Sequence, residues 1–137
     1  MGGPSHRCSI DPGWPATNAM STLGIIGGFV LLAAAGTLAR VVVGRLLNGS
    51  WFPVGTFAVN TVGSFALGLL TASGWGGSAA TTLVGVAALG SLTTFSTVAW
   101  ETLSLAMADQ KRRAGVYLGF TVLAGLAAAL AGLELGG

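Results

Sequence analysis

Hydrophobic residues gather in four long runs along the chain, and short polar connections separate the runs. A helix that crosses a bilayer needs about 20 mostly apolar residues, and each run is consistent with that length. The runs cover residues 23–46, 54–72, 79–107 and 114–133. Because they use most of the chain, the pattern predicts an all-α membrane protein with four transmembrane helices.

The segments outside the runs are short or lack apolar residues. Residues 1–20 contain three of the four prolines and no apolar run, so we expect a disordered N-terminal extension before one membrane domain at 21–137. Met20 is an alternative candidate for the first residue. The first connection carries Asn48-Gly49, a turn signal that also explains its match to a glycosylation sequon.

Polar side chains recur inside the second run, where Thr56, Asn60 and Ser64 follow one another at steps of four. That spacing places them on one face of a helix. Hydroxyls in membrane helices often hydrogen-bond a neighbouring helix, and we favour that interpretation for Thr56 and Ser64. Asn60 has two donors and two acceptor sites to satisfy at mid-membrane depth, so it is a candidate site residue.

The third run is longer than one span requires, and its middle is polar. Residues 90–94 combine a glycine with threonines of weak helix propensity, which predicts a break in the helix. Carbonyl groups freed by such a break can coordinate a cation. Beyond the break two neighbouring faces are expected, one with Thr94, Thr97, Glu101 and Ser104 and one with Phe95 and Val98.

Two of the charged residues within the apolar runs cannot simply be assigned to a loop, and ionisable groups at membrane depth mark function by default. Glu101 lies in the third run, and its depth depends on where the broken helix begins. Arg40 lies near the end of the first run, where it either anchors the helix by snorkelling or attracts ions in a vestibule. On the fourth run, Tyr117 and Thr121 share a helical face.

Composition supports the membrane assignment. Hydrophobic residues make up 53% of the chain, whereas six lysines and arginines and four acidic residues are too few to solvate a soluble surface. The 23 glycines favour close helix packing, which we expect at Gly115 and Gly119. The sequence lacks a nucleotide-binding motif and a grouped nucleophile, base and orienting residue, so an enzyme is not predicted.

The distribution of cations predicts the orientation. Arg45 and the cluster at 111–113 fall in or next to the first and third connections, whereas the other side carries Arg7. Because cytoplasmic loops are enriched in lysine and arginine, we expect these two connections in the cytoplasm and the chain in the plasma membrane. The hydroxyls, one amide and a phenylalanine, with few cations, suit a small, strongly hydrogen-bonding anion.

Three motifs together resemble the CrcB/Fluc fluoride channel family over residues 23–133. They are Gly36-Thr37-Leu38-Ala39-Arg40, the segment from Gly55 to Phe65, and Gly90 to Thr97 with Glu101. The resemblance implies a passive fluoride channel that relieves fluoride toxicity by efflux. It also implies an antiparallel dimer of four-helix subunits, with two fluoride paths and a central structural sodium ion.

The resemblance further assigns roles to individual residues. Sodium would be held by the carbonyls of Gly90 and Thr93. Arg40 corresponds to the family's first-helix arginine. The residues implied along the fluoride path are Asn60, Phe95, Ser96, Thr97, Tyr117 and Thr121.

Two departures from the family pattern affect the expected assembly. Val98 stands where the family has a second pore phenylalanine, and Ser91 stands where a second glycine is usual. A homodimer would therefore lack a ring in both paths. Together with the unequal loop charges, this favours a fixed-orientation subunit of a heterodimer, paired with an oppositely inserted homologue.

Two other functions remain open. One is a non-conducting structural subunit of such a channel, which the loss of the phenylalanine at Val98 would permit. The other is a small proton-coupled multidrug transporter. The transporter is disfavoured because its mechanism requires an acidic residue in the middle of the first helix, whereas the candidate acid here, Glu101, lies in the third run.

Overall fold

The computed structural model describes residues 19–49, 51–73 and 82–137, and every regular element in that part of the chain is helical. The elements are α1 (Ala19–Leu47), α2 (Val54–Ala72), a π-helical segment η1 (Thr82–Leu89), α4 (Gly90–Leu92), α5 (Phe95–Met107) and α6 (Lys111–Gly136). The prediction of an all-α chain is confirmed for these residues. The expected extension lies outside them up to residue 18, and α1 already begins at Ala19.

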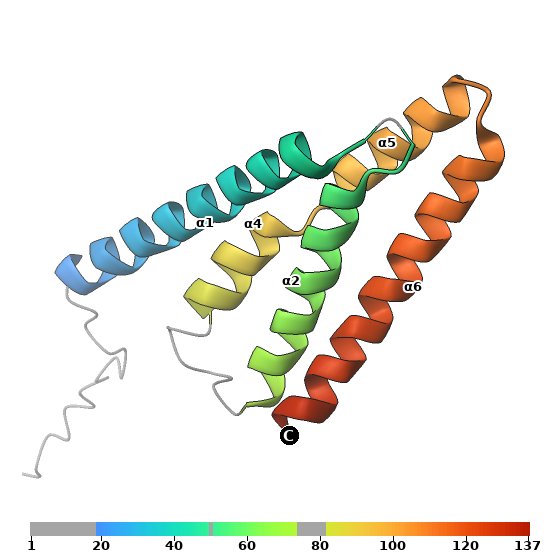
Figure 1. Ribbon diagram of the computed structural model, residues 1–137. Coiled ribbons are helices and arrows are strands. Elements are labelled where there is room, and N and C mark those ends of the chain that lie inside the picture. The colour runs from blue at the N-terminus through green and yellow to red at the C-terminus, as the bar shows by residue number, and fades with distance from the viewer. Residues whose placement is uncertain (1–18, 50, 74–81) are drawn as a thin grey trace, which may run out of the picture.

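Helix α2 lies at the centre of the arrangement (Figure 1). It runs beside α6 in the most extensive contact of the molecule, and on its other side it meets α1, η1 and α4. Helix α1 packs on η1 and α4, whereas α5 packs on α6. The two halves of the third apolar run therefore contact different neighbours, and α2 bridges them.

Small residues permit the close approach of α2 and α6. A Cβ added at Gly68 would collide with the carbonyl oxygen of Ala129, and one added at Gly132 would collide with that of Phe65. Close backbone contact of this kind drives helix association in lipid. The packing expected at Gly115 and Gly119 is wrong within this chain, because an added Cβ there meets nothing described within 4 Å.

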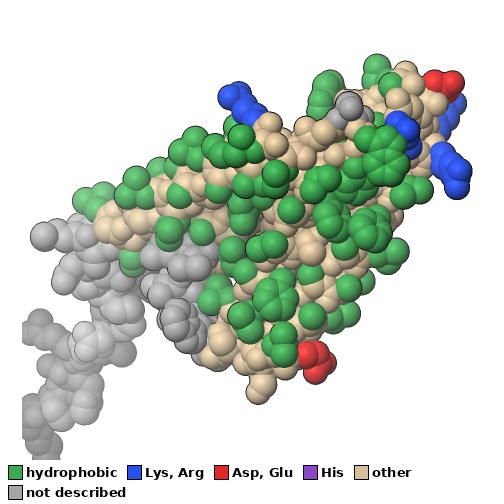
Figure 2. Space-filling view, in the orientation of Figure 1, with side chains coloured by type: hydrophobic (Ala, Val, Ile, Leu, Met, Phe, Trp, Pro, Cys, Tyr) green, Lys and Arg blue, Asp and Glu red, His purple; other side chains and the backbone are tan. Residues whose placement is uncertain are grey.

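Within the described residues, three helices are long and apolar enough to cross a membrane, by length and composition: residues Leu23–Leu47 of α1, together with α2 and α6. Large hydrophobic side chains are exposed along them, such as Leu31 at 72% and Leu123 at 67%. In Figure 2 hydrophobic side chains cover much of the visible face, and most visible lysines and arginines gather near the α5–α6 turn. Such a surface suits lipid or a protein partner better than water.

Two boundaries differ from those expected. In the described part of the third run, Gly90–Leu92 is helical, and the extended residues are Thr93 (ψ 148°) and Thr94 (ψ 123°). The cations at 111–113, expected within a charged loop at 108–113, instead form the first turn of α6, which begins at Lys111. Lysine and arginine are good helix formers, so the cluster extends the helix while remaining exposed. The turn before it contains Asp109 at φ 57°, which aspartate tolerates better than most residues.

Candidate functional site

The extended residues between α4 and α5 are held by one side chain of α2. Oδ1 of Asn60 accepts a hydrogen bond from the backbone N–H of Thr94 at 2.7 Å, and its Nδ2 donates to the carbonyl of Thr94 at 3.3 Å. The carboxamide thus replaces the backbone acceptor that a continuous helix would have supplied to the N–H of Thr94, and it adds a donor to the carbonyl of Thr94. This satisfies polar groups that would be costly to leave unpaired inside a membrane.

Hydroxyl groups then start α5. Thr94 is its N-cap, because Oγ1 of Thr94 accepts from the N–H of Thr97 at 3.3 Å. The same Oγ1 lies 3.0 Å from Oγ of Ser96 and 3.4 Å from Oγ1 of Thr97. Threonine is a favoured cap since its oxygen satisfies a free N–H of the first turn. The cap leaves Phe95, the first residue of α5, 73% exposed.

An open groove of about 610 Å³ runs past this junction, between the break, α2 and α6. No charged side chain is among the described residues that line it. Its polar groups come from Asn60, Ser64, Thr93, Thr94 and Thr121, and its walls include Gly90, Phe95, Val98, Val122, Gly125, Leu126 and Ala129.

Thr121 is notable among the lining residues. Its side chain is buried, and within the described part of the chain its Oγ1 has no hydrogen-bond partner. Buried hydroxyls normally have a partner, so this group keeps an unused donor, and its oxygen lies buried beside the groove. Val98 is also buried, at 2% exposure, yet it forms part of the groove wall.

A second polar cluster centres on the carboxylate of Glu101. Its Oε1 accepts from Nδ2 of Asn48 and from Oγ1 of Thr56, each at 2.8 Å, and its Oε2 accepts from the hydroxyl of Tyr117 at 2.6 Å. The side chain of Asn48 also accepts from the N–H of Thr56 at 3.1 Å. Glu101 therefore connects the end of α1, α2 and α6 through one charge that is well supplied with donors.

The two clusters divide the residues that the sequence singled out. The groove is lined by Asn60, Phe95, Thr121, Gly90 and Thr93, and Ser96 and Thr97 lie beside it at the start of α5. Tyr117 and Glu101 belong to the second cluster, and Tyr117 lies one helical turn before Thr121 on α6.

Arg40 is brought to neither cluster. It is half-buried on α1, does not line the groove, and forms no side-chain hydrogen bond with another described residue. Asn48, in turn, has a role that its turn sequence did not predict. Its position between an apolar run and the polar face that begins at Thr56 was a hint of this role, but no local sequence pattern pairs residue 48 with residue 101.

Comparison with known proteins identifies the family. Residues 27–133 match the family described as "CrcB-like protein, Camphor Resistance (CrcB)". The chain is 41% identical over 113 residues to "Fluoride-specific ion channel FluC 1" of Geobacillus kaustophilus, covering 81% of this chain and 92% of the relative. It is 39% identical over 110 residues to "Fluoride-specific ion channel FluC" of Xanthomonas euvesicatoria, covering 75% and 83%.

A third relative, "Fluoride-specific ion channel FluC 2" of Haloarcula marismortui, is 51% identical over 72 residues, or 53% of this chain and 60% of the relative. These relatives are named as ion channels and not as enzymes. With a match over most of its length and relatives near 40% identity, the chain belongs to the CrcB family.

Proposed function

We propose that this protein is a subunit of a passive fluoride channel in the plasma membrane, which releases fluoride from the cell and so relieves its toxicity. The observation that carries the proposal is the groove at the break, where neutral hydrogen-bond donors face an open space without a charged side chain among its described lining. The names of the relatives support fluoride as the ion.

The donors suit a small anion that is strongly hydrated. Nδ2 of Asn60 carries two hydrogens, and the carbonyl of Thr94 takes one of them, so the second is available to an ion. The hydroxyl of Thr121 adds a further donor. The exposed ring of Phe95 offers the positive edge of its quadrupole. Ser96, Thr97 and Tyr117 extend this path of polar groups along α5 and α6.

The charged residues act at the edges of this path. Glu101 holds three helices together beside the path, since its oxygens already accept three hydrogen bonds. The place of Arg40, outside the groove and the polar clusters, supports the anchoring interpretation over the vestibule. Among described residues the first helix carries no acid, and the donors around Glu101 leave little room for a transported proton. Both points speak against a proton-coupled transporter.

A structural sodium ion belongs to the same proposal. The N–H of Thr94, which would serve the carbonyl of Gly90 in a continuous helix, donates to Asn60 instead. The N–H of Thr97, which would serve the carbonyl of Thr93, donates to Oγ1 of Thr94. Both carbonyls therefore lack their helical donors, and free carbonyl oxygens suit a hard cation. Gly90 and Thr93 would hold sodium, which would supply a fixed positive charge between the subunits.

The working unit is an antiparallel heterodimer of four-span subunits, in which η1, α4 and α5 form one interrupted third span. The groove is open on one side and Phe95 projects from it, so a second chain is needed to close the path. Val98 supplies no ring to that path, and a partner with phenylalanine at this position would restore one. The cations near the end of α1 (Arg40 and Arg45) and at the start of α6 (residues 111–113) favour one orientation.

Fluoride efflux from liposomes tests the assembly. Liposomes that contain this chain alone should release little fluoride, whereas co-purification with an oppositely inserted homologue that retains the second phenylalanine should give fast efflux. Fluoride is followed with a selective electrode. Fast efflux from the chain alone would contradict the heterodimer, and absence of efflux from every pair would contradict the channel itself.

Two substitutions in the pair separate a conducting subunit from a structural one. Asn60→Asp keeps an acceptor for the N–H of Thr94 but places a negative charge in the path, so efflux should fall at least about tenfold. Phe95→Ala should also reduce efflux. Thr71→Ala is the control, because Oγ1 of Thr71 bonds its own helix at an exposed position. If Asn60→Asp and Phe95→Ala both conduct normally, the chain is a structural subunit.

A further inference from the structure

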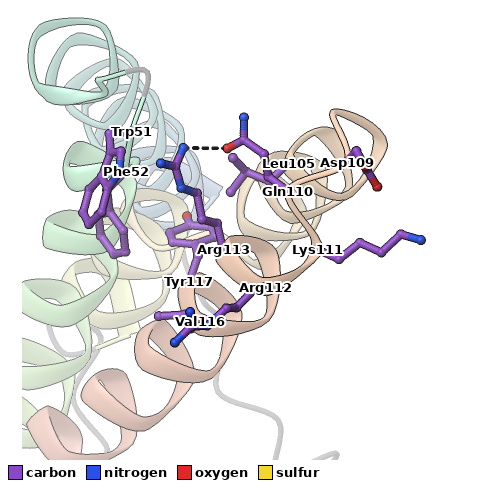
Figure 3. Close-up of a pocket in the computed structure, with 10 residues that line it drawn as sticks. All are labelled: Trp51, Phe52, Leu105, Asp109, Gln110, Lys111, Arg112, Arg113, Val116 and Tyr117. Carbon is purple, nitrogen blue, oxygen red and sulfur yellow. Dashed lines mark hydrogen bonds between the residues drawn. The ribbon is translucent and has the colours of Figure 1, made fainter.

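A second pocket, of about 450 Å³, lies where α6 begins, next to the connection between α1 and α2. Figure 3 shows Trp51 and Phe52 on one side of it and the start of α6 on the other. Three consecutive cations, Lys111, Arg112 and Arg113, belong to its lining. The pocket shares Tyr117 with the polar cluster of Glu101 but none of its described lining with the groove at the break.

The cations of this pocket lack an acidic partner within the described part of the chain. Nη1 of Arg113 donates to Oε1 of Gln110 at 2.8 Å, and its guanidinium lies 5.4 Å from the centre of the Trp51 ring. Asp109 also lines the pocket, but Figure 3 shows its carboxylate directed away from Arg113. Most guanidinium hydrogens of Arg113 thus remain free for an anion, with a geometry that matches phosphate oxygens.

The remaining walls are apolar and face the surroundings. Trp51 is 68% exposed and Val116 is 61% exposed. The rings of Phe52 and Tyr117 pack edge-on with their centres 5.3 Å apart, and this contact fixes the inner wall of the pocket. Since α6 is long and apolar enough to cross a membrane, its first turn lies at the depth of the headgroups, where tryptophan is enriched.

We propose that this pocket binds the headgroup of an anionic phospholipid. The phosphate accepts hydrogen bonds from Arg112 and Arg113, while the acyl chains lie along the apolar surface that begins at Val116. Cations without acidic partners explain the preference for a negative headgroup, and the exposed apolar wall explains why a lipid is favoured over a free phosphate. The cations of this site lie outside the proposed fluoride path, with which its described lining shares Tyr117 alone.

Native mass spectrometry of the purified chain tests the site without any measurement of fluoride. The chain in detergent is titrated with phosphatidylglycerol or with phosphatidylcholine of the same acyl chains. Arg112→Gln/Arg113→Gln should weaken phosphatidylglycerol binding about thirtyfold. The two arginines should share this loss about equally, because each cation near an anionic lipid contributes a similar favourable free energy of binding. Arg45→Gln, which removes a cation on α1 outside the pocket lining, is the matched control and should bind as the unmodified chain does.

A second variant guards against loss of folding. Lys111→Gln/Arg112→Gln leaves the contacts of Arg113 with Gln110 and Trp51 intact and should still weaken binding clearly. The proposal is overturned if phosphatidylcholine binds as tightly as phosphatidylglycerol, or if both double variants keep full affinity. It is also overturned if millimolar inorganic phosphate displaces the lipid, which would indicate a free-anion site, or if assembly with a second chain expels it.

Discussion

At the end of α1, one carboxamide makes three hydrogen bonds that join α1 to α2 and α5. Asn48 donates to Oε1 of Glu101 at 2.8 Å and to Oγ1 of Thr56 at 3.1 Å, and it accepts from the N–H of Thr56. Glu101 is half-buried, so its charge depends on such donors for the solvation that water no longer supplies. The first connection is therefore tied to the interior and not only to solvent.

Replacement of Asn48 tests this role. Asn48→Ala removes the donor to Glu101 and should lower the free energy of unfolding by about 1.5–3 kcal/mol, as for a hydrogen bond to a charged group. Asn48→Asp should destabilise more, because it places a second carboxylate beside Oε1 of Glu101. Thermal unfolding in detergent measures both. The reverse order of stability would contradict the network, and Gln110→Ala, which loses only an exposed bond to Arg113, serves as the control.

The network also shows what a sequence can reveal about a site. Asn60 was identifiable because its polarity contrasts with the apolar run around it. Asn48 sits in a turn where asparagine is ordinary, so its partner 53 positions away leaves no local signal. Thr56 was expected to hydrogen-bond a neighbouring helix, and it does so through Glu101. The partner of a polar residue depends on tertiary packing, which periodicity alone does not determine.

Among the elements, α2 and α6 show how strongly glycine positions depend on the neighbouring helix. Gly68 and Gly132 each face the backbone of the other helix, whereas Gly119 on α6 meets open space. All three look alike in sequence, because each lies in an apolar run. Helix position could be predicted to within a few residues from hydropathy, but the face packed within the chain could not, since the expected Gly115 and Gly119 pair meets no described residue of this chain.

Alanine at these glycines should separate the two faces. Gly68→Ala or Gly132→Ala forces α2 and α6 apart and should lower the free energy of unfolding by about 1–3 kcal/mol, in the range of overpacked cores. Gly119→Ala, in the same helix as Gly132, should be neutral or stabilise by up to about 1 kcal/mol through helix propensity. Unfolding of the single chain in detergent measures the three. Equal losses at Gly68 and Gly119 would show that close approach is not responsible.

For the whole molecule, charge and apolar surface are separated along the helix axes. Arg113 and Trp51 are in contact at one end, where the first connection meets the start of α6. Helix α2 runs from that end to Ser73, which is its C-cap at the other. Between the ends the described surface is largely apolar, and most residues in the apolar stretch of α1 are exposed or only half-buried in the chain. Lipid and a second subunit are the surroundings that suit this surface.

The same polarity predicts that the chain inserts in one orientation, which can be measured with cysteines at the two ends. In a Cys8→Ser background, Ala108→Cys should resist an impermeant thiol reagent in intact cells, whereas Ser73→Cys should react, because the cationic end is retained in the cytoplasm. Both positions are exposed in the chain. Disrupted cells, in which both should react, provide the control.

Neutralising the cations at the start of α6 should then allow the chain to insert in both orientations. Replacing Lys111, Arg112 and Arg113 by glutamine leaves Arg45 and Arg40 as the cations near the cytoplasmic end, so a fraction of the chains should insert the other way. Ala108→Cys in that variant should become partly reactive in intact cells. Equal labelling of Ala108→Cys and Ser73→Cys in chains that keep all three cations would mean that the subunit inserts both ways. An antiparallel homodimer could then form without a second, oppositely inserted homologue, and Val98 alone would still favour a heterodimer.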